Sequence, residues 1–443
     1  MTIFEQAKEV RPSGLSLRRR LGVGPKTVLL ILVLIQIFNG VDRFLVAALA
    51  EPIKHDLKLS DTQLGLLSGM MFAAFYSVFG LFLGWLSDRT HRVRMLATVC
   101  TIWSLLSGAC GLVTNFAQMA LLRVGVAIGE AGASPPAYSL TCDYFPPLKR
   151  GKALAMFSIA IALGSGVATI GGGYIAAHFG WRVAFFATAV PGVVLAATLL
   201  IFVAEPRRGR LDPASASSAA PQSILSTMKI FARDPVLRNV TLGAAFLVFA
   251  SHGVTGWLPA FLMRSKGMEM REMALYYGGL STIGMIVGAL GAGWAADKIA
   301  GHRNHWLPLI PAAAYLVSLP AVLLAATSSS WVEALLLLAI PLFAFQTYHP
   351  IAFLLVQNNM PANQRSVSTS VLLLFIYVVG VGGGVTYVGI ASDFLSKTVG
   401  TDSLAIAFLT LGPIFVLAIF FQWRASRQML RLRRMPLPTQ AGV

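Results

Sequence analysis

Four charged side chains lie inside long apolar stretches of the sequence, well away from the ends of those stretches. Asp42 and Arg43 are adjacent in one stretch, and Arg123 and Glu130 share another. A charge within hydrocarbon costs at least about 2.5–3.5 kcal/mol, and such residues are normally paired and functional. The four charges sum to zero, as an apolar interior requires. Their chemistry is that of proton carriers and anion-binding groups.

Helical geometry predicts how deep these charges lie in a membrane. With a rise of about 1.5 Å per residue, Asp42, Arg43 and Arg123 lie about 10–12 Å below the same membrane surface. Glu130 follows Arg123 by two helical turns, so it lies about 10 Å deeper on the same helix face. If both stretches face one cavity, Asp42 can bridge to Arg123, while Glu130 can pair with whichever arginine reaches it.

This cluster predicts coupling between protons and an anionic substrate. Burial favours the neutral carboxylic acid, whereas a nearby arginine favours the carboxylate. Protonation of Glu130 or Asp42 would therefore free a guanidinium, which could bind a phosphate or a carboxylate through paired hydrogen bonds. Asp42 and Glu130 are the predicted proton carriers, and Arg43 and Arg123 are predicted to bind substrate.

The apolar stretches that carry these charges have the length of membrane spans. Of the 443 residues, 56% are hydrophobic and 12% are charged, against about 25% charged in soluble domains. Stretches of about 20–28 residues can cross ~30 Å of hydrocarbon as helices. Twelve spans are predicted, at residues 27–50, 62–86, 96–115, 117–141, 152–178, 183–204, 236–262, 273–296, 307–327, 332–358, 367–395 and 404–425.

Lysine and arginine are distributed unevenly between the two ends of these spans. With the N-terminus inside, the cytoplasmic segments hold 26 of the 35 Lys and Arg residues and the outside loops hold 7. This bias predicts cytoplasmic termini whose basic residues contact anionic membrane lipids. It explains the net charge of +17 without a nucleic-acid partner. The short loops favour a bacterial inner membrane, and we expect a monomer.

The chain divides into two similar halves. The predicted regions are a basic N-terminus (1–26), a six-helix bundle (27–204), a cytoplasmic linker (205–235), a second six-helix bundle (236–425) and a basic tail (426–443). GWLSDR at 84–89 recurs as GWAADK at 293–298, an offset of 209 residues. With this offset, the adjacent charges of span 1 align with Ser251 and His252. Halves repeated in the same orientation predict a substrate site between them near mid-membrane.

Several motifs point to one family. Twelve spans, a basic central loop and G-x-L-x-D-R from Gly84 to Arg89 resemble the major facilitator superfamily. NGVDRFLVAAL in span 1, LKLSDTQLGLL entering span 2 and LLRVGVAIGEAGASPPAYSL in span 4 are similar to spinster-type transporters. Animal members of that family export sphingosine-1-phosphate or lysophospholipids. The resemblance implies an all-α polytopic fold of two pseudo-symmetric six-helix bundles, in which spans 1, 4, 7 and 10 line a central cavity.

The resemblance also implies a gate on the cytoplasmic side. Asp88 would face the N-terminus of span 11, where a carboxylate is favoured, and Arg89 and Arg92 would brace it. Asp297 and Lys298 would act in the same way on span 5. Small residues at every fourth position also predict close, sliding helix contacts. They are Gly65, Gly69, Ala73 and Ser77 in span 2, and Gly284, Gly288, Ala292 and Ala296 in span 8.

Candidates for contacting the substrate also occur in the second half. They are His252, Trp257, Tyr348 and Tyr377, with Gln346 and His349 beside them in the cavity-lining spans. Their apolar surroundings suit a lipid-like tail. The predicted function is therefore secondary active transport of an amphipathic anion, such as a lysolipid, by alternating access with proton coupling.

Other functions stay open at the level of sequence. A proton-coupled drug antiporter or a small organic-anion symporter of the same superfamily would use the same charges. A membrane sensor fits less well, because the longest loop has only about 30 residues. HExxH, GxSxG and phosphate-loop motifs are missing in a suitable context, so the sequence predicts no enzyme, metal site or cofactor. Pro135 and Pro136 predict a kink in span 4 just beyond Glu130.

Overall fold

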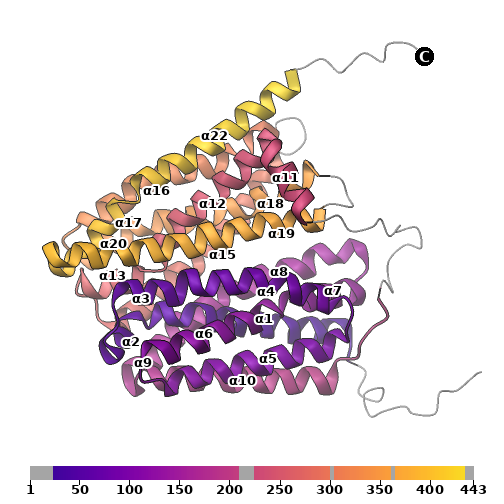
Figure 1. Ribbon diagram of the computed structural model, residues 1–443, viewed down its shortest axis with the longest axis horizontal. Coiled ribbons are helices and arrows are strands. Elements are labelled where there is room, and N and C mark those ends of the chain that lie inside the picture. Colours follow the sequence, from indigo (N-terminus) through magenta and orange to yellow (C-terminus); the bar gives the residue numbers. More distant parts are fainter. Residues whose placement is uncertain (1–22, 209–223, 300–303, 361–364, 435–443) are drawn as a thin grey trace, which may run out of the picture.

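The computed structural model describes residues 23–208, 224–299, 304–360 and 365–434, and these residues form helices and short connections without a strand. Figure 1 shows two bundles lying side by side with their helices nearly parallel. The first half of the chain (indigo to magenta) forms one bundle, and the second half (red to yellow) forms the other. Residues 1–22 of the predicted N-terminus, residues 209–223 of the linker and residues 435–443 of the tail lie outside the described residues.

Each bundle is built from six spans, several of them interrupted. The first half contains α1 (Pro25–Ala48), α2 (Ala50–Leu57), α3 (Asp61–Gly65), α4 (Met71–Ser87), α5 (Arg92–Ala109), α6 (Phe116–Ala131), α7 (Ser134–Tyr144), α8 (Pro147–Gly166), α9 (Gly173–Phe179) and α10 (Trp181–Phe202). The second half contains α11 (Ile224–Arg233), α12 (Pro235–Thr255), α13 (Leu258–Arg264), α14 (Met270–Glu272), α15 (Gly278–Ile299), α16 (Leu309–Thr327), α17 (Trp331–Ala344), α18 (Tyr348–Asn358), α19 (Arg365–Phe375), α20 (Gly383–Val399), α21 (Ser403–Leu409) and α22 (Gly412–Arg434).

The predicted membrane spans agree with these helices. Ten stretches of the described chain are long and apolar enough to cross a membrane, and the last, of 66 residues, contains spans 11 and 12. Span 4 is absent from the ten because it is broken into α6 and α7. The predicted all-α fold of two six-helix bundles is confirmed.

The break in span 4 lies where the two prolines predicted it. Helix α6 ends at Ala131, directly after Glu130, and α7 begins at Ser134. Pro135 and Pro136 therefore occupy the first turn of α7, where backbone N–H groups have no partner within the helix and proline is tolerated. The break allows the two parts of span 4 to differ in direction immediately beside the buried acid.

Spans 2, 5, 8 and 11 each contain a π-helical turn. The turns are Leu66–Met70, Val167–Gly172, Met273–Tyr277 and Ile376–Gly382. The turns of spans 5 and 11 start 209 residues apart, which is the offset of the duplicated motif. Such turns are rare and are frequent at functional sites. All four turns lie in spans that pack against the other half.

Span 2 packs closely against span 11 across the two halves. A Cβ atom on Gly65 would lie 3.0 Å from the carbonyl oxygen of Val385, and one on Gly69 would lie 2.8 Å from Oγ1 of Thr386. Thr386 also donates a hydrogen bond to the carbonyl of Gly65 at 3.1 Å. The predicted small-residue contact of span 2 is therefore a contact between the halves.

The close helix contact predicted for the small residues of span 8 forms within the second half. A Cβ atom on Gly288 would lie 2.1 Å from the carbonyl oxygen of Phe343, and one on Gly284 would lie 3.0 Å from that of Leu342. Both partners belong to α17 of the same half. Span 8 instead meets span 5 through Gly278, whose added Cβ would contact Ile170 at 2.7 Å. The small residues of span 8 therefore pack within one bundle, and their sliding stays a prediction.

We predict that Gly164 is required where spans 1 and 5 cross. A Cβ at this position would lie 2.4 Å from the carbonyl oxygen of Ile37, so Gly164→Ala should destabilise the protein by about 1–3 kcal/mol through overpacking. The matched control is Gly171→Ala on the same span, whose added Cβ would have its nearest neighbour at 4.0 Å. Thermal unfolding in detergent measures both, and equal unfolding temperatures would contradict the prediction.

Candidate functional site

Arg43 lies at the centre of the buried charge cluster. Its Nη2 is 3.3 Å from Oε2 of Glu130 on α6, and its Nε is 3.4 Å from the same oxygen. Its Nη1 donates a hydrogen bond to the hydroxyl of Tyr377 at 3.1 Å. Asn39, one turn earlier on α1, accepts a fourth hydrogen bond at 3.3 Å. One guanidinium therefore joins an acid of the first half to a tyrosine of the second half.

Aromatic rings surround the guanidinium of Arg43. Its central carbon lies 4.7 Å from the ring centroid of Tyr76, 5.5 Å from that of Phe72 and 5.9 Å from that of Tyr377. The rings of Tyr76 and Tyr377 are 4.8 Å apart across the interface between the halves. Cation–π attraction stabilises a guanidinium where water is scarce. The rings therefore compensate part of the desolvation of Arg43.

The predicted bridge between Asp42 and Arg123 is wrong. Arg123 donates its hydrogen bond to the backbone carbonyl of Asp42 at 3.2 Å. The carboxylate of Asp42 accepts a hydrogen bond from the hydroxyl of Ser107 on α5 at 2.6 Å. Adjacent helical residues point about 100° apart, so Asp42 faces span 3 while Arg43 faces the interface. The ion pair of the cluster is thus Arg43 with Glu130.

Several buried polar atoms of the cluster make no hydrogen bond with the described residues. They are Oε1 of Glu130, Nδ2 of Asn39, Nε of Arg123 and Oε1 of Gln36. Buried donors and acceptors normally find partners, because an unmade hydrogen bond is costly. The set contains both donors and acceptors, which could form hydrogen bonds with a substrate that carries polar groups.

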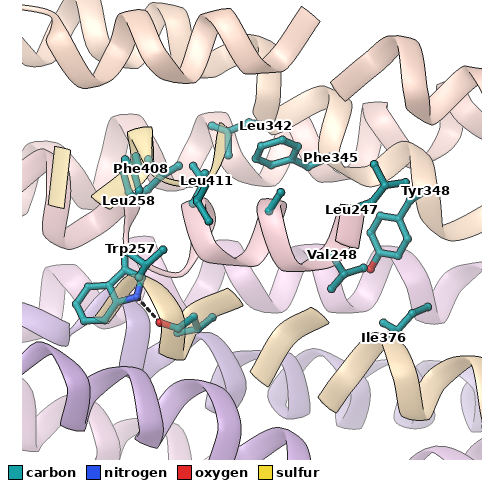
Figure 2. Close-up of a cluster of buried hydrophobic side chains, with 14 of the residues drawn as sticks. Leu247, Val248, Trp257, Leu258, Leu342, Phe345, Tyr348, Ile376, Phe408 and Leu411 are labelled. Carbon is teal, nitrogen blue, oxygen red and sulfur yellow. Dashed lines mark hydrogen bonds between the residues drawn. The ribbon is translucent and has the colours of Figure 1, made fainter. Parts of the chain in front are cut away.

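The second-half candidates divide between this cluster and the hydrophobic core. Tyr377 lies in the cluster, as described above. His252 lies on span 7, where its Nδ1 is 3.4 Å from the hydroxyl of Ser251. In Figure 2, Trp257 donates its indole N–H to the carbonyl of Val385, at 2.9 Å, and Tyr348 lies among core side chains. The expected substrate contact of Trp257 is therefore not supported, because its polar atom is satisfied inside the second bundle.

The predicted gating residues of the first half contact different partners and do not form one cluster. Asp88 is 74% exposed, and its Oδ1 lies 3.8 Å from Arg208, after the end of span 6. Arg89 stacks on the ring of Trp85 at 4.3 Å. Residues 361–364, before span 11, lie outside the described part of the chain, so the contact of Asp88 with span 11 stays a prediction. A Cβ atom added to Gly84 would lie 3.8 Å from a ring carbon of Pro135.

Arg92 does not brace Asp88, and this part of the prediction is wrong. The Arg92 side chain is buried and binds Asp143 at 2.5 Å and Glu205 at 2.6 Å. These contacts tie the start of span 3 to the ends of spans 4 and 6 within one bundle. In the second half, Asp297 and Lys298 are both exposed, and Lys298 lies over the ring of Trp294 at 3.8 Å.

A second charge cluster joins the halves at the end of the molecule where α2, α3 and α13 meet. Arg264, the last residue of α13, binds both carboxylate oxygens of Asp61 at 2.6 and 2.9 Å. It also binds Glu51 at 2.5 and 3.1 Å, and Lys54 lies 2.5 Å from Asp61. Asp61 is 1% exposed. This cluster is therefore desolvated, and its charges balance.

Asp393 of α20 adds a further contact at this end. Its carboxylate accepts hydrogen bonds from the backbone N–H groups of Asp61, at 2.9 Å, and of Thr62, at 2.7 Å. A carboxylate is favoured at the positive N-terminus of a helix. This is the interaction that the sequence predicted for Asp88 and span 11, found here between span 11 and the start of span 2. The sequence did not reveal this cluster, because charges near span ends are common.

The arrangement defines a class of membrane carrier: two related six-helix bundles with paired charges at mid-depth between them. The chain belongs to the major facilitator superfamily, whose family profile, described as Major Facilitator Superfamily, matches residues 32–384. The protein is thus a membrane transporter, and its expected spinster-type relationship is confirmed by the similarities that follow.

Curated relatives include transporters with different names. The chain is 34% identical to an MFS-type efflux pump of Mycolicibacterium smegmatis, over 90% of this chain and 92% of the relative. It is 30% identical to the cis,cis-muconate transport protein of Acinetobacter baylyi, over 63% and 68%. It is 27% identical to protein spinster homolog 1 of Xenopus tropicalis, over 84% and 73%.

Solved structures support the same relationship. A bacterial homolog of the human lysosomal transporter spinster, in an inward-facing and unoccupied conformation, matches with a TM-score of 0.84 at 27% identity. The match covers 93% of this chain and 99% of that one. The occupied inward-facing form of such a homolog matches with a TM-score of 0.82 at 28% identity, covering 96% and 100%.

We predict that Arg264→Gln opens the end of the molecule at which this residue lies. Loss of one partner from a buried ion pair costs about 3–5 kcal/mol. In this variant the cost destabilises the conformation in which residue 264 binds Glu51 and Asp61. Spin labels at exposed positions 58 and 397, in a cysteine-free background, should show longer distances by pulsed electron resonance. The control, Arg271→Gln, alters an exposed arginine; identical distance distributions in both variants would contradict the prediction.

Proposed function

We propose that the protein is a secondary active transporter that moves an amphipathic anion by alternating access and is driven by protons. One observation carries this proposal: Arg43 binds Glu130 of span 4 and Tyr377 of span 11 at the same time. The charge on Glu130 therefore acts on a side chain that spans the interface between the halves. The proposed setting is a bacterial inner membrane with both termini cytoplasmic, on the basis of the lysine and arginine bias.

Protonation of Glu130 is the proposed coupling step. A proton on Oε2 removes the negative charge that holds the guanidinium of Arg43. The freed guanidinium then presents its paired N–H groups to a phosphate or carboxylate, a geometry that arginine suits. Loss of the proton restores the ion pair and displaces the anion. The carboxylate of Glu130 and the anionic substrate thus compete for one arginine, so that a proton on Glu130 favours binding of the anion.

Asp42 and Arg123 are proposed as a second acid and a second cation of the same site. Asp42 is 1% exposed, and its described hydrogen-bond donor is a neutral hydroxyl. Arg123 lies 5.2 Å from the ring centroid of Phe72, which also faces Arg43. The two guanidinium groups therefore share one aromatic neighbour. An anionic head group between them would meet both.

The name of one relative, the cis,cis-muconate transport protein, supports an anionic substrate. Muconate is a dicarboxylate, and an arginine site suits such a molecule. The spinster similarity favours a lysolipid or a sphingoid phosphate, whose tail would lie against the apolar second half. A small organic-anion symporter is therefore one alternative. The efflux-pump relative favours a second one, a proton-coupled drug antiporter.

We predict that the substrate class can be identified from ligand-induced stabilisation of the purified protein. Lysophospholipids and sphingoid phosphates should raise the unfolding temperature, because a ligand that binds only the folded state stabilises it. The stabilisation should be larger at the lower of two pH values, because a proton on Glu130 frees the guanidinium of Arg43 for the anion. Muconate and cationic drugs serve as comparison ligands. Stabilisation by a drug alone would favour the antiporter, and stabilisation by muconate alone would favour the small-anion symporter.

We predict that Glu130→Gln uncouples transport from protons in proteoliposomes. The amide keeps the shape of the acid but takes up no proton, so accumulation driven by a pH gradient should be lost while exchange without a gradient persists. Arg43→Ala should weaken anion binding by about 10–100-fold, since a charge-assisted hydrogen bond contributes about 1.5–3 kcal/mol.

The matched control for the coupling variants is Glu333→Gln, which alters an exposed acid at the start of α17. It should transport at the wild-type rate with the wild-type pH dependence. Asp42→Asn and Arg123→Ala complete the set. Wild-type rates and pH dependence in all four cluster variants would rule out the proposed coupling.

A further inference from the structure

An apolar groove of about 680 Å³ lies between spans 8, 9 and 10 of the second bundle. Span 8 lines it with Val287, Gly288, Gly291, Ala292 and Ala295. Apolar side chains of α16 and α17 form its other walls. The polar side chain among the lining residues is that of Thr347, whose hydroxyl donates to the carbonyl of Ala344 at 2.7 Å. The groove therefore offers a ligand an apolar surface.

The groove faces the lipid and is separate from the charge cluster. Span 8 contacts span 5 through Gly278 and Thr282. Because an α-helix has 3.6 residues per turn, Gly291 lies on nearly the opposite face of span 8 from these two residues. Neighbouring side chains Val287 and Leu290 are 49% and 60% exposed. Since these helices cross a membrane, the surface that they expose on this side meets acyl chains.

The first bundle fills the same position with large side chains. With the offset of 209 residues, Gly288, Gly291 and Ala295 of span 8 correspond to larger residues of span 2. Those residues are Phe79, Phe82 and Leu86. In the structure Phe79 stacks on Phe75 with ring centroids 6.3 Å apart, and Phe82 stacks on Trp85 at 5.9 Å. The groove thus results from small residues on one half of a duplicated scaffold.

The dimensions of the groove suit one acyl chain. Val287 and Ala295 are eight residues apart, which corresponds to about 12 Å along the helix. The hydrocarbon of one leaflet is about 15 Å deep, half of the ~30 Å core. A chain lying along the groove would therefore run parallel to the helix for most of one leaflet.

A positive charge lies at one end of the groove. Lys298 follows Gly291 and Ala295 at helical spacing, so it continues the groove face, while Asp297 points about 100° away from it. The ammonium lies 3.8 Å from the ring centroid of Trp294, which is 62% exposed. Tryptophan and lysine at the end of a span are typical of the level of lipid headgroups. An anionic headgroup would meet Lys298 at this level.

We propose that this groove binds one acyl chain of an anionic glycerophospholipid, whose headgroup phosphate contacts Lys298. The lipid comes from the leaflet on the cytoplasmic side in the orientation proposed above. Because span 8 also contacts span 5 of the other half, the bound lipid supports a helix that takes part in the interface. This inference concerns a surface outside the proposed transport site and stands independently of the transported substrate.

Photolabelling of the whole protein in vesicles tests the proposal. The probe is phosphatidylglycerol with a diazirine on its acyl chain, diluted into phosphatidylcholine. Peptide mapping should find the label concentrated on residues 287–295 and 310–317. Gly291→Phe, which introduces the residue type found at Phe82 of span 2, should reduce this labelling at least five-fold. A Cβ at Gly291 meets no atom within 4 Å, so the substitution is compatible with folding, and Ala295→Leu serves as a second variant.

Two further variants separate the proposal from its rivals. Leu336→Phe alters a lipid-facing residue outside the groove, 71% exposed, and should leave the labelling unchanged. Lys298→Gln should abolish the advantage of labelled phosphatidylglycerol over labelled phosphatidylcholine. Labelling spread evenly over all lipid-facing helices, or unaffected by both groove variants, would overturn the proposal. Displacement of the label by a lysolipid but not by unlabelled phosphatidylglycerol would assign the groove to the tail of the transported substrate and would equally overturn it.

Discussion

A guanidinium held against a carboxylate in the middle of an apolar bundle is the constraint on which the rest of this structure depends. Neither Arg43 nor Glu130 could remain charged there alone, because the desolvation of a single buried ion is prohibitive. The break in span 4 follows Glu130 directly, and the rings of Phe72, Tyr76 and Tyr377 surround Arg43. The surrounding elements therefore position and shield one ion pair that reaches both halves.

Carboxylates paired with positive charge also occur at the boundary between the bundles. Asp393 caps the N-terminus of α3 from the opposite half, while Arg264 neutralises Asp61 and Glu51 beside it. The helix end supplies partial positive charge without a side chain. These contacts join a few groups at the ends of helices from the two halves.

The two halves share one fold but carry different functional side chains. All four charges of the buried cluster belong to the first half. The positions of the second half that align with Asp42 and Arg43 are Ser251 and His252. Conversely, span 8 has small residues and a groove where span 2 has stacked aromatic rings.

The sequence by itself determined the spans, the kink after Glu130, the duplication and the identity of the buried charges, because apolar length, proline and charge act locally along the chain. Only the tertiary structure decided which charges meet. Asp42 turns to Ser107 and Arg43 to Glu130, since neighbouring residues of a helix face different partners and the rotation of each helix is set by packing. For the same reason, the contacts of Arg264 and the partner of the small residues in span 8 appear only when distant spans are brought together.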